Sequence, residues 1–475
     1  MIDLGDIRRY HENNRIEAKK SLGGLPHSIW ETYSAFANTL GGLILLGVEE
    51  YRDKSLHPID LPDPEGLAAR FWSMVNDPAQ VSANILTEEN VSILPSEGKR
   101  IVVIDVPRAS RYDRPVYVGG DAGTGTYRRN GEGDYRCTPE EIRAMRRDSA
   151  ARTQDMRVLE ELDASALDGG TLSRFRAGME VLRPGHPWLA LPAGELLGKL
   201  GALEGDPAHP TAAGLLMFGR TADIRGEYPD YRLEYRERDE NGEEGFSSDD
   251  GGWSGNLWDF YLRVYDRLVW DIEDGGEEDG AALRRALREA LANCLEHADY
   301  YGRRGLSVVK EGRVIRLENP GSFRVDPSAA RRGGRSDPRN GALSRMFALA
   351  GVGQGSGGGL TGIYQAWARR GWSAPVLKES FGPERVSLCL VMERPARTRA
   401  ETAEEERQRI VEYLTDAVSA SPAALGQALS MGPSRTETRL RELEAQELVI
   451  REEDGNVTLR AKPAPEPKPG TDESV

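Results

Sequence analysis

This 475-residue chain is poor in cysteine, and its three cysteines are far apart in the sequence. They are Cys137, Cys294 and Cys389, and no two of them form a C-x-x-C pair. That spacing argues against a disulfide framework and against a cysteine zinc site. No apolar run reaches the roughly 18 residues that a membrane-spanning helix needs. The first residues, MIDLGDIRRYHENN, also lack the apolar core of a signal peptide. We therefore expect a cytoplasmic protein that does not enter a membrane.

The chain also lacks an overall excess of basic residues, because its formal net charge is −15. This balance argues against indiscriminate binding to nucleic acid. The charge is unevenly distributed, however: residues 201–300 carry 24 acidic and 10 basic side chains, whereas residues 301–400 carry 7 and 18. The basic segment is suited either to facing phosphate groups or to neutralising the acidic segment across a domain contact.

The chain is long enough for several domains, since one hydrophobic core rarely serves more than roughly 250–300 residues. Strand-like apolar runs and helical patterns both occur, which predicts a multidomain protein of mixed α/β and α+β class. We expect domains at 1–150, 281–395 and 401–460, a helical connecting region with an acidic loop at 151–280, and a disordered tail rich in proline and charge at 461–475.

The most informative stretch is AFANTLGGLILLGVEE, residues 35–50. An amphipathic helix, IWETYSAFAN, stops at two glycines, and an apolar run typical of a buried strand ends in Glu49 and Glu50. Upstream, ENNRIEAKK supplies Glu12, Glu17 and Lys19. Together these residues resemble the Schlafen AlbA-type domain. Its signature is an acidic E-x-K strand, a helix ending in F-A-N-T-x-G-G, and an acidic strand end.

Some Schlafen-family members cleave RNA, so the resemblance implies a metal-dependent nuclease as one alternative. Its carboxylates would be Glu12, Glu17 and Glu50, with Glu49 in place of Glu50 as a variant. Three converging carboxylates can hold Mg²⁺ or Mn²⁺ ions that activate a water, and Lys19 would stabilise the phosphate in the transition state. The structural alternative is that Glu17 and Lys19 form a surface pair, while Glu49 and Glu50 lie in a solvated turn.

The same segment contains a cluster of arginines that flanks Tyr112 and Tyr127. The cluster comprises Arg108, Arg111, Arg114, Arg128 and Arg129. Guanidinium groups interleaved with aromatic rings are suited to contacting a phosphate backbone. Bacterial proteins that resemble this one are commonly assigned DNA binding. We therefore predict that the arginine cluster is a nucleic-acid-binding surface.

A second constellation lies between residues 284 and 360. In the helical segment RRALREALANCLEHADYYG, Glu289 and Asn293 stand one turn apart on one face. A strand ending in Asn319-Pro320-Gly321 follows, and then GGRSDPRN and the glycine-rich GVGQGSGGGL. This order resembles the GHKL ATPase arrangement. It is still more similar to the divergent ATP-binding region that follows Schlafen AlbA-type domains in many bacterial transcriptional regulators.

This resemblance implies a site for ATP and Mg²⁺. Asn293 would hold the Mg²⁺ that bridges the phosphates, and Glu289 would orient or deprotonate a water. Asn319 and Gly321 stand where GHKL enzymes carry the aspartate and the first glycine turn that recognise adenine. Backbone amides in the glycine-rich loop would bind phosphate oxygens, at Gly355, Gly357, Gly358 and Gly359. The sequence is compatible with nucleotide binding, with weak ATP hydrolysis, and with a vestigial fold.

The C-terminal segment contains three helical patterns and a hairpin signal at Asp454-Gly455. It resembles a winged helix-turn-helix, in which Arg435 and Arg439 would lie in the N-terminal half of the recognition helix. Residues 401–475 carry 9 basic and 16 acidic side chains, however, which is a poor electrostatic footprint for DNA. Winged helices also dimerise or bind other proteins, so both interpretations stay open.

In order along the chain, the three domains resemble a Schlafen AlbA-type domain, a GHKL-like α/β sandwich and a winged helix-turn-helix. We expect a nucleic-acid-binding regulator with a nucleotide-sensing ATP-binding-like domain, acting on DNA rather than RNA and forming a homo-oligomer. The alternative is a Schlafen-like metal-dependent nuclease that acts on tRNA, other RNA or DNA, in a phage-defence role. A third interpretation is a scaffold that binds only proteins.

Overall fold

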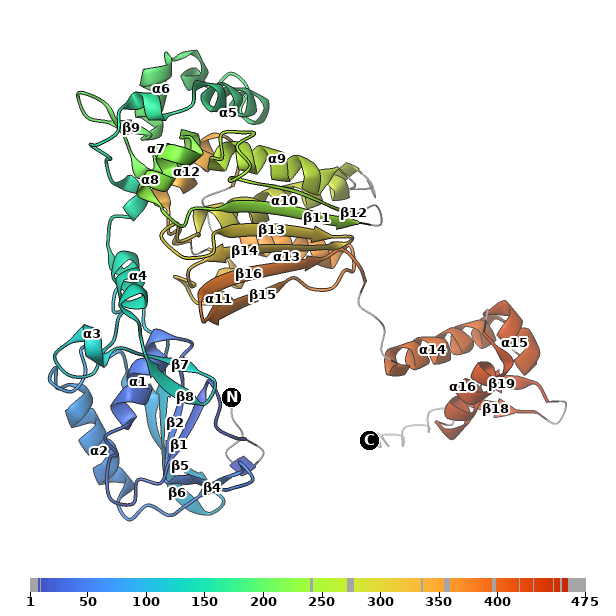
Figure 1. Ribbon diagram of the computed structural model, residues 1–475. Helices are drawn as coiled ribbons and strands as arrows, with labels where there is room; N and C mark the ends of the chain where they lie inside the picture. Colours follow the sequence, from blue (N-terminus) through green and yellow to red (C-terminus); the bar gives the residue numbers. More distant parts are fainter. Residues whose placement is uncertain are drawn as a thin grey trace, which may run out of the picture. The chain divides into compact units, whose positions relative to one another are not determined.

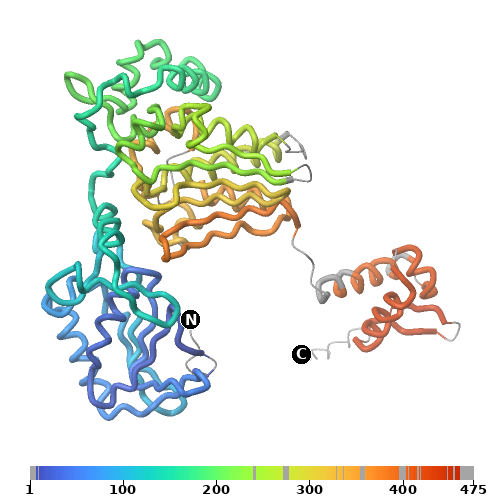
Figure 2. Tube along the Cα trace, viewed as in Figure 1, coloured from blue at the N-terminus to red at the C-terminus, as the bar shows by residue number. Residues whose placement is uncertain are grey.

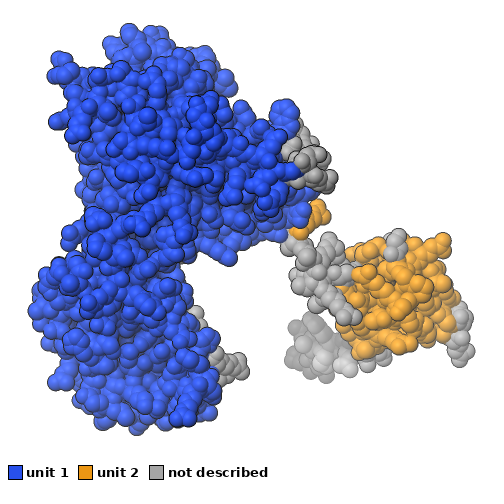
Figure 3. Space-filling model, in the orientation of Figure 1, with its two compact units in different colours: residues 1–393 blue, residues 394–475 orange. Residues whose placement is uncertain are grey.

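The computed structural model describes residues 7–8, 10–239, 242–270, 277–334, 336–353, 359–394, 399–417, 419–429, 431–446, 448–452 and 455–459. The chain forms two compact units, residues 1–393 and 394–475, which Figure 3 colours separately. Figures 1 and 2 trace the path of the chain through each unit. Within the described ranges, no helix is both long enough and apolar enough to cross a membrane.

The first unit begins with a four-stranded sheet in the order β1-β2-β6-β5. Its strands are β1 (Ile16–Lys19), β2 (Gly42–Leu46), β5 (Val91–Ser96) and β6 (Lys99–Val106). β1 and β2 are parallel, and the other neighbours are antiparallel. Helices α1 (Ile29–Asn38) and α2 (Pro64–Val75) pack against one face of the sheet. Trp30 of α1 stacks on Phe71 of α2 with ring centroids 5.4 Å apart, which joins the two helices.

The junction between α1 and β2 explains the F-A-N-T-x-G-G motif. Gly41 has a φ of +72°, and a Cβ at this position would lie 2.7 Å from the carbonyl oxygen of Val106 on the neighbouring strand. Only glycine combines that backbone conformation with such a close approach. Asn38 at the end of α1 donates hydrogen bonds to the carbonyl oxygens of Val116 and Tyr127, at 2.7 and 2.9 Å. The motif therefore holds the helix against the sheet and against two later segments.

Two hairpins and two helices complete this N-terminal domain. They are β3 (Val48–Glu50) with β4 (Leu56–Pro58), β7 (Tyr127–Asn130) with β8 (Gly133–Arg136), α3 (Ala122–Gly125) and α4 (Pro139–Ser149). A helical region follows, with α5 (Gly169–Leu182), α6 (Ala193–Leu200), α7 (Ala212–Phe218), α8 (Thr221–Glu227) and the short strands β9 (Leu203–Glu204) and β10 (His209–Pro210). This region shares one hydrophobic core with the sheet that follows it.

The rest of the first unit is built on a six-stranded sheet in the order β12-β11-β13-β14-β16-β15. Its strands are β11 (Leu233–Asp239), β12 (Gly242–Ser247), β13 (Leu306–Glu311), β14 (Val314–Pro320), β15 (Val376–Phe381) and β16 (Glu384–Val391). β11 and β13 are parallel, and the other neighbours are antiparallel. Helices α9 (Leu257–Val269), α10 (Glu277–Glu296) and α13 (Gly359–Arg369) lie along one face (Figure 1), with α11 (Pro327–Arg332) and α12 (Gly341–Leu349) beside them.

The hydrophobic core between this sheet and its helices fixes the position of α10. Alternate residues of the central strands are buried against the helices, among them Val308, Ile315, Leu317, Leu388 and Leu390. Leu287, Leu291 and Leu295 of α10 belong to the same core. Because these leucines recur every four residues, they form one face of the helix. The polar residues of α10 that are described below lie on another face of the helix.

The structure corrects the sequence interpretation between residues 226 and 256, where we expected an acidic loop. This segment contains the hairpin of β11 and β12, which forms one edge of the six-stranded sheet. Leu233 and Tyr235 are buried, whereas Arg232 before them and Arg236 after them are exposed. The edge strand itself, β12, exposes Glu243 and Glu244, and charged side chains on an edge strand protect the edge from pairing with another chain. The charged composition therefore concealed a strand pattern of period two.

The second unit is small and has its own core. It consists of α14 (Arg399–Ala417), β17 (Ser419–Ala420), α15 (Pro422–Ala428), α16 (Pro433–Ala445), β18 (Val449–Arg451) and β19 (Val457–Leu459). The strands pair antiparallel in the order β17-β19-β18. Leu414, Leu425, Leu440 and Val457 are buried at its centre. Asp454 and the tail at 461–475 lie outside the described residues. The predicted multidomain protein of mixed α/β class is confirmed.

Candidate functional site

A cavity of about 140 Å³ lies between α10, the end of β14 and the start of α13. This volume is several times the space that a single water needs. Glu289 and Asn293 of α10, Asn319 of β14 and Gly359 of α13 all contribute to its wall. These elements are far apart in the sequence, and the packing of α10 and α13 on the sheet brings them together.

Gly359, the first residue of α13, lies directly against the polar side chains of α10. A Cβ at this position would stand 2.7 Å from Oε2 of Glu289 and 3.3 Å from Nδ2 of Asn293. A larger residue would therefore displace the Glu289 carboxyl group. The residue that ends the glycine-rich loop and the polar face of α10 thus form one wall of the cavity. Gly355, Gly357 and Gly358, which we expected to bind phosphate, lie outside the described residues.

Gly321 has a different role from the one expected. It is not among the described residues of the cavity wall. Its φ is +101°, and a Cβ there would lie 2.2 Å from Nη1 of Arg339. Gly321 therefore leaves space for a buried guanidinium group rather than for a ligand. The sequence motif indicates a tight turn at this position. It could not identify Arg339, which packs against the turn.

Burial changes the ionisation of the groups that α10 brings to the cavity. Loss of solvent raises the pKa of Glu289, and it raises the pKa of Glu296 to about 7, an effect that a hydrogen bond from Ser344 opposes and the charge of Glu289 strengthens. Loss of solvent, together with the charges of Arg339 and Arg324, lowers the pKa of His297 to about 4. Near pH 7, Glu296 is about half ionised and His297 is neutral.

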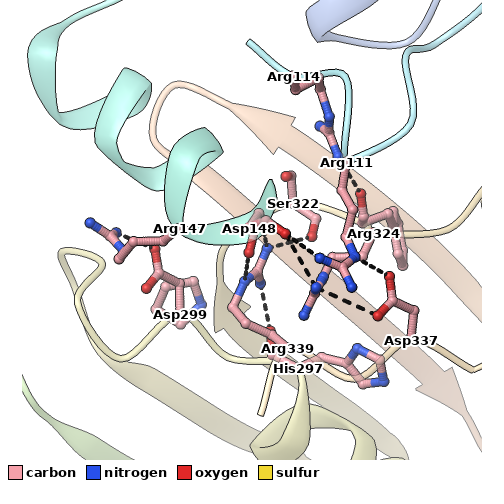
Figure 4. Close-up of polar contacts among 12 residues, drawn as sticks. Arg111, Arg114, Arg147, Asp148, His297, Asp299, Ser322, Arg324, Asp337 and Arg339 are labelled. Atoms are coloured by element: carbon pink, nitrogen blue, oxygen red, sulfur yellow. Dashed lines mark hydrogen bonds and ion pairs between the residues drawn. The ribbon is translucent and has the colours of Figure 1, made fainter. Parts of the chain in front are cut away.

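Arg324 and Asp337 also line the cavity. Asp337 belongs to the motif GGRSDPRN, whereas no sequence motif includes Arg324. The Arg324 side chain is 3% exposed and lies 3.5 Å from the Asp337 carboxylate. Its two terminal nitrogens donate to the carbonyl oxygens of Pro338 and Asp148, at 2.9 and 3.3 Å (Figure 4). Within the described part of the chain, its Nε has no hydrogen-bond partner. The cavity therefore has a buried cation whose hydrogen bonds are incomplete.

The acidic residues of the N-terminal domain do come close to one another. Loss of solvent raises the pKa of Glu12, and the charges of Glu17 and Glu50 raise it further. Both oxygens of Glu17 are occupied, because Lys19 Nζ lies 2.5 Å from one and Arg129 Nη2 lies 2.7 Å from the other. Among the described residues, no group of three or more acidic, histidine or cysteine side chains is arranged to hold a metal ion.

The two carboxylates at the strand end also have cationic partners. Lys20 Nζ lies 2.6 Å from Glu49, and Lys54 Nζ lies 3.5 Å from Glu50. These pairs are partly exposed to solvent. Both carboxylates lie in strand β3, which pairs with β4, and not in a turn. Lysine and arginine side chains thus pair with Glu17, Glu49 and Glu50. The second carboxylate oxygen of Glu50, Oε1, is buried and has no hydrogen-bond partner among the described residues.

The predicted basic surface is not a free surface. Arg111, Arg114 and Arg129 are buried, and Arg128 lies 3.0 Å from the Glu141 carboxylate. Arg129 pairs with Asp134 as well as with Glu17. Arg108, Arg111 and Arg114 contact the part of the first unit that carries the six-stranded sheet. Their partners follow them by more than 200 positions, so the local sequence pattern could not reveal the contact.

The arginines of the second unit are paired within that unit. Glu406 of α14 pairs with both Arg435 and Arg439, and Arg439 Nε lies 2.8 Å from it. Arg439 also lies 2.7 Å from Glu442, and its side chain is 11% exposed. Arg435 keeps 54% of its side-chain surface exposed. Of the two, only Arg435 is accessible to a partner without rearrangement.

Comparisons with known proteins identify the N-terminal domain. Residues 12–138 match the family model described as Schlafen, AlbA_2, and residues 143–234 match a domain of unknown function, DUF8451. None of the curated proteins matches the chain.

Two solved structures are similar to the chain. One is the crystal structure of the DIP2311 protein from Corynebacterium diphtheriae, with 18% identity, a TM-score of 0.40, and coverage of 95% of this chain and 82% of that one. The other is the solution structure of the N-terminal domain of a RecG-related protein from Nitrosomonas europaea, with 29% identity, a TM-score of 0.23, and coverage of 29% and 95%. The family match confirms the domain that the motif at residues 35–50 predicts: residues 12–138 form a Schlafen AlbA_2 domain.

Proposed function

We propose that this protein is a nucleic-acid-binding regulator, and that a nucleotide held in the cavity controls its binding. The observation that carries the proposal is the convergence of Glu289, Asn293 and Gly359 on one cavity wall. An amide and a carboxyl group one helical turn apart, against the residue that ends a glycine-rich loop, are what a GHKL-like ATP-binding domain requires. The six-stranded sheet with helices on one face is compatible with such a domain.

The chemistry of the cavity wall fits a magnesium nucleotide. The side-chain oxygen of Asn293 is the kind of hard ligand that Mg²⁺ accepts. Glu289, with its raised pKa, is suited to accepting a proton from water. Leu317 and Leu388 line the same cavity and offer an apolar surface for a purine ring. Asn319 beside them can form hydrogen bonds with the edge of the base.

The nucleic-acid part of the proposal rests on the Schlafen AlbA_2 domain and on the second unit. Three helices and a three-stranded antiparallel sheet are the parts of a winged helix, in which α16 would be the recognition helix. Because Arg439 is committed to Glu406 and Glu442, we expect Arg435 at the start of α16 to contact a phosphate. We propose DNA as the partner, in line with the bacterial proteins that the architecture resembles.

Isothermal titration calorimetry of the full chain with ATP and Mg²⁺ tests the nucleotide site. We expect binding by the wild-type protein and a loss of at least about tenfold in affinity for Asn293→Ala, which equals about 1.4 kcal/mol. Asn130→Ala is the matched control, because Asn130 is exposed on β7. No binding heat from the wild-type protein, or equal affinities for the two variants, would overturn the proposed site.

A metal-dependent nuclease at Glu12, Glu17 and Glu50 is the second candidate. The charges of Glu17 and Glu50 act on the carboxyl group of Glu12, and this proximity favours it. The pairing of Glu17 with Lys19 and Arg129 opposes it, since a metal ion would have to replace at least one of these cations. The regulator is therefore the better-supported function.

A further inference from the structure

Three arginines of the N-terminal domain contact the part of the first unit that bears the cavity. We call this contact the arginine joint. It comprises Arg108, Arg111 and Arg114 on one side and Phe323, Asp337 and Glu379 on the other. Arg108 binds the Glu379 carboxylate through two nitrogens, at 2.6 and 2.9 Å, and donates to the carbonyl oxygen of Phe323 at 2.8 Å. This is a bidentate pair, the strongest geometry for arginine and a carboxylate.

Arg111 forms the centre of the joint. Its Nε lies 2.6 Å from the Asp337 carboxylate, and its Nη1 donates to the carbonyl oxygens of Asp148 and Ala150 at 2.5 and 2.9 Å. Figure 4 shows that Arg111 and Arg324 both approach the Asp337 carboxylate, with Asp148 nearby. The Asp337 carboxylate therefore contacts one arginine from each side of the joint, Arg111 and Arg324.

The third arginine of the joint, Arg114, lacks part of its hydrogen bonds among the described residues. Arg114 is 5% exposed, and its Nη2 lies 3.5 Å from the carbonyl oxygen of Phe323. In the described residues, its Nε has no hydrogen-bond partner. Loss of solvent and the charge of Arg108 lower its pKa to about 10, and loss of solvent raises the pKa of the nearby Glu384 to about 7. Charges buried with incomplete partners oppose the closed contact.

The joint and the cavity share residues. Asp337 and Phe323 line the cavity and also hold the arginines of the joint. Arg324 lines the cavity as well, and it contacts both Asp337 and the carbonyl oxygen of Asp148. A charge placed in the cavity therefore acts directly on the groups that hold Arg111. No intermediate element is needed to carry the effect.

We propose that the arginine joint responds to occupancy of the cavity, an inference that rests on the proposed nucleotide site. A polyanionic ligand in the cavity attracts Arg324 and repels Asp337. The pair between Asp337 and Arg111 weakens, and the joint opens, while the buried pair of Asp148 and Arg339 continues to connect the two parts. Arg108, Arg111 and Arg114 then face solvent, where phosphates of a nucleic acid replace the carboxylates. The predicted basic surface is thus present in the protein but masked until the ligand binds.

Ligand binding and opening of the joint are thermodynamically coupled in this proposal, and the coupling can be measured. If the ligand favours the open joint, any change that opens the joint must increase the affinity for the ligand, by an amount set by how far the change shifts the closed–open equilibrium. Arg108 and Glu379 are not among the described residues that line the cavity, so removing their pair does not remove a ligand contact. Arg108→Ala and Glu379→Gln should both bind nucleotide more tightly than the wild-type protein does.

The experiment combines calorimetry with hydrogen–deuterium exchange on the full chain, using AMPPNP with Mg²⁺ as the probe. We expect AMPPNP to accelerate amide exchange in residues 108–116, and both joint variants to bind it about fivefold or more tightly. Arg100→Ala is the matched control, since Arg100 lies in the same domain and pairs with Glu65 at the exposed surface. It should bind AMPPNP as the wild-type protein does. Circular dichroism confirms that each variant is folded.

The outcomes separate the two claims. If AMPPNP binds but exchange in residues 108–116 stays unchanged and the joint variants keep wild-type affinity, the joint is a fixed structural contact. The inference is then overturned, while the nucleotide site stands. If no AMPPNP binds to the wild-type protein, the proposed function fails and the inference fails with it. If the joint opens, labelled duplex DNA and a free phosphate titration distinguish nucleic acid from small anions as the ligand of the exposed arginines.

Discussion

Asp148 and Arg339 form a doubly hydrogen-bonded ion pair inside the first unit. Arg339 Nε lies 2.8 Å from one carboxylate oxygen of Asp148, and Nη2 lies 2.6 Å from the other (Figure 4). The side chain of Arg339 is 10% exposed and that of Asp148 is 12% exposed. The absence of a side chain at Gly321 leaves the space that Arg339 occupies. The pair joins the end of α4 to the segment before α12, so it connects the N-terminal domain with the part that bears the cavity.

Breaking this pair from one side should be strongly destabilising. Asp148→Asn leaves the buried Arg339 without its counter-charge, and we expect a loss of about 3–5 kcal/mol in the free energy of unfolding. Urea denaturation followed by circular dichroism measures the loss. Arg100→Ala, which breaks an exposed pair, should cost far less. Equal losses for the two variants would contradict the structural role of the buried pair.

The buried Glu296 predicts a specific dependence of stability on pH. Its pKa is raised from 4.5 to about 7 in the folded protein, so between these values the folded state binds more protons than the unfolded state does. Glu296 therefore reduces stability as the pH rises through this window. His297, whose pKa is lowered from 6.5 to about 4, acts in the opposite sense between those values.

Comparison of wild type with Glu296→Gln isolates the contribution of Glu296. We expect the variant to be more stable than the wild-type protein at pH 8, by a free energy on the order of 3 kcal/mol, and nearly equal in stability at pH 4. Urea denaturation at both pH values measures the difference. Glu160→Gln, at an exposed position, should show no such difference. A constant offset between variant and wild type across this pH range would contradict the assignment.

Two glycines on α13 provide a matched test of the cavity. A Cβ at Gly359 meets Glu289 and Asn293, whereas a Cβ at Gly362 meets nothing within 4 Å. We expect Gly359→Ala to lower the affinity for ATP about tenfold, because the methyl group displaces both side chains. Gly362→Ala should keep wild-type affinity and stabilise the helix by roughly 0.5–1 kcal/mol. Calorimetry with ATP and Mg²⁺ makes the comparison, and equal affinities would place the ligand elsewhere.

Glu17 separates the regulator from the nuclease. In the regulator, Glu17→Gln removes the charge that holds Arg129 and lowers stability by about 1–3 kcal/mol, without creating or removing cleavage. In the nuclease, cleavage of single-stranded RNA or tRNA in the presence of Mn²⁺ disappears with the same substitution. Gel analysis of labelled RNA measures this directly. Cleavage that depends on Mn²⁺ in the wild-type protein and is lost in the variant would favour the nuclease.

The N-terminal domain was predictable because its signature is local. The helix IWETYSAFAN, the two glycines and the apolar run each determine a few adjacent residues, and the structure has α1, the turn at Gly41 and β2 in these places. Likewise, one face of a single helix was enough to predict that the side chains of Glu289 and Asn293 lie close together. Such local patterns predict the backbone conformation and the direction of the side chains over one or two helical turns.

The arginine joint was not predictable, because its partners are remote. Arg108 and Glu379 are separated by 271 positions, and Arg111 and Asp337 by 226. The sequence indicates that arginines cluster near aromatic rings, which is compatible both with a phosphate surface and with a domain contact. Only the fold decides between them, since packing of the two domains brings carboxylates to the cluster. The same reason explains why Arg324 was not recognised as part of the cavity.

Fluorescence anisotropy with labelled duplex DNA tests the central claim most directly, that a nucleotide in the cavity controls nucleic-acid binding. We predict that AMPPNP with Mg²⁺ increases the affinity of the full chain for DNA at least about fivefold, that added salt weakens the binding, and that Asn293→Ala abolishes the AMPPNP effect. The same affinity with and without AMPPNP, in a protein that calorimetry shows to bind the nucleotide, would contradict the account.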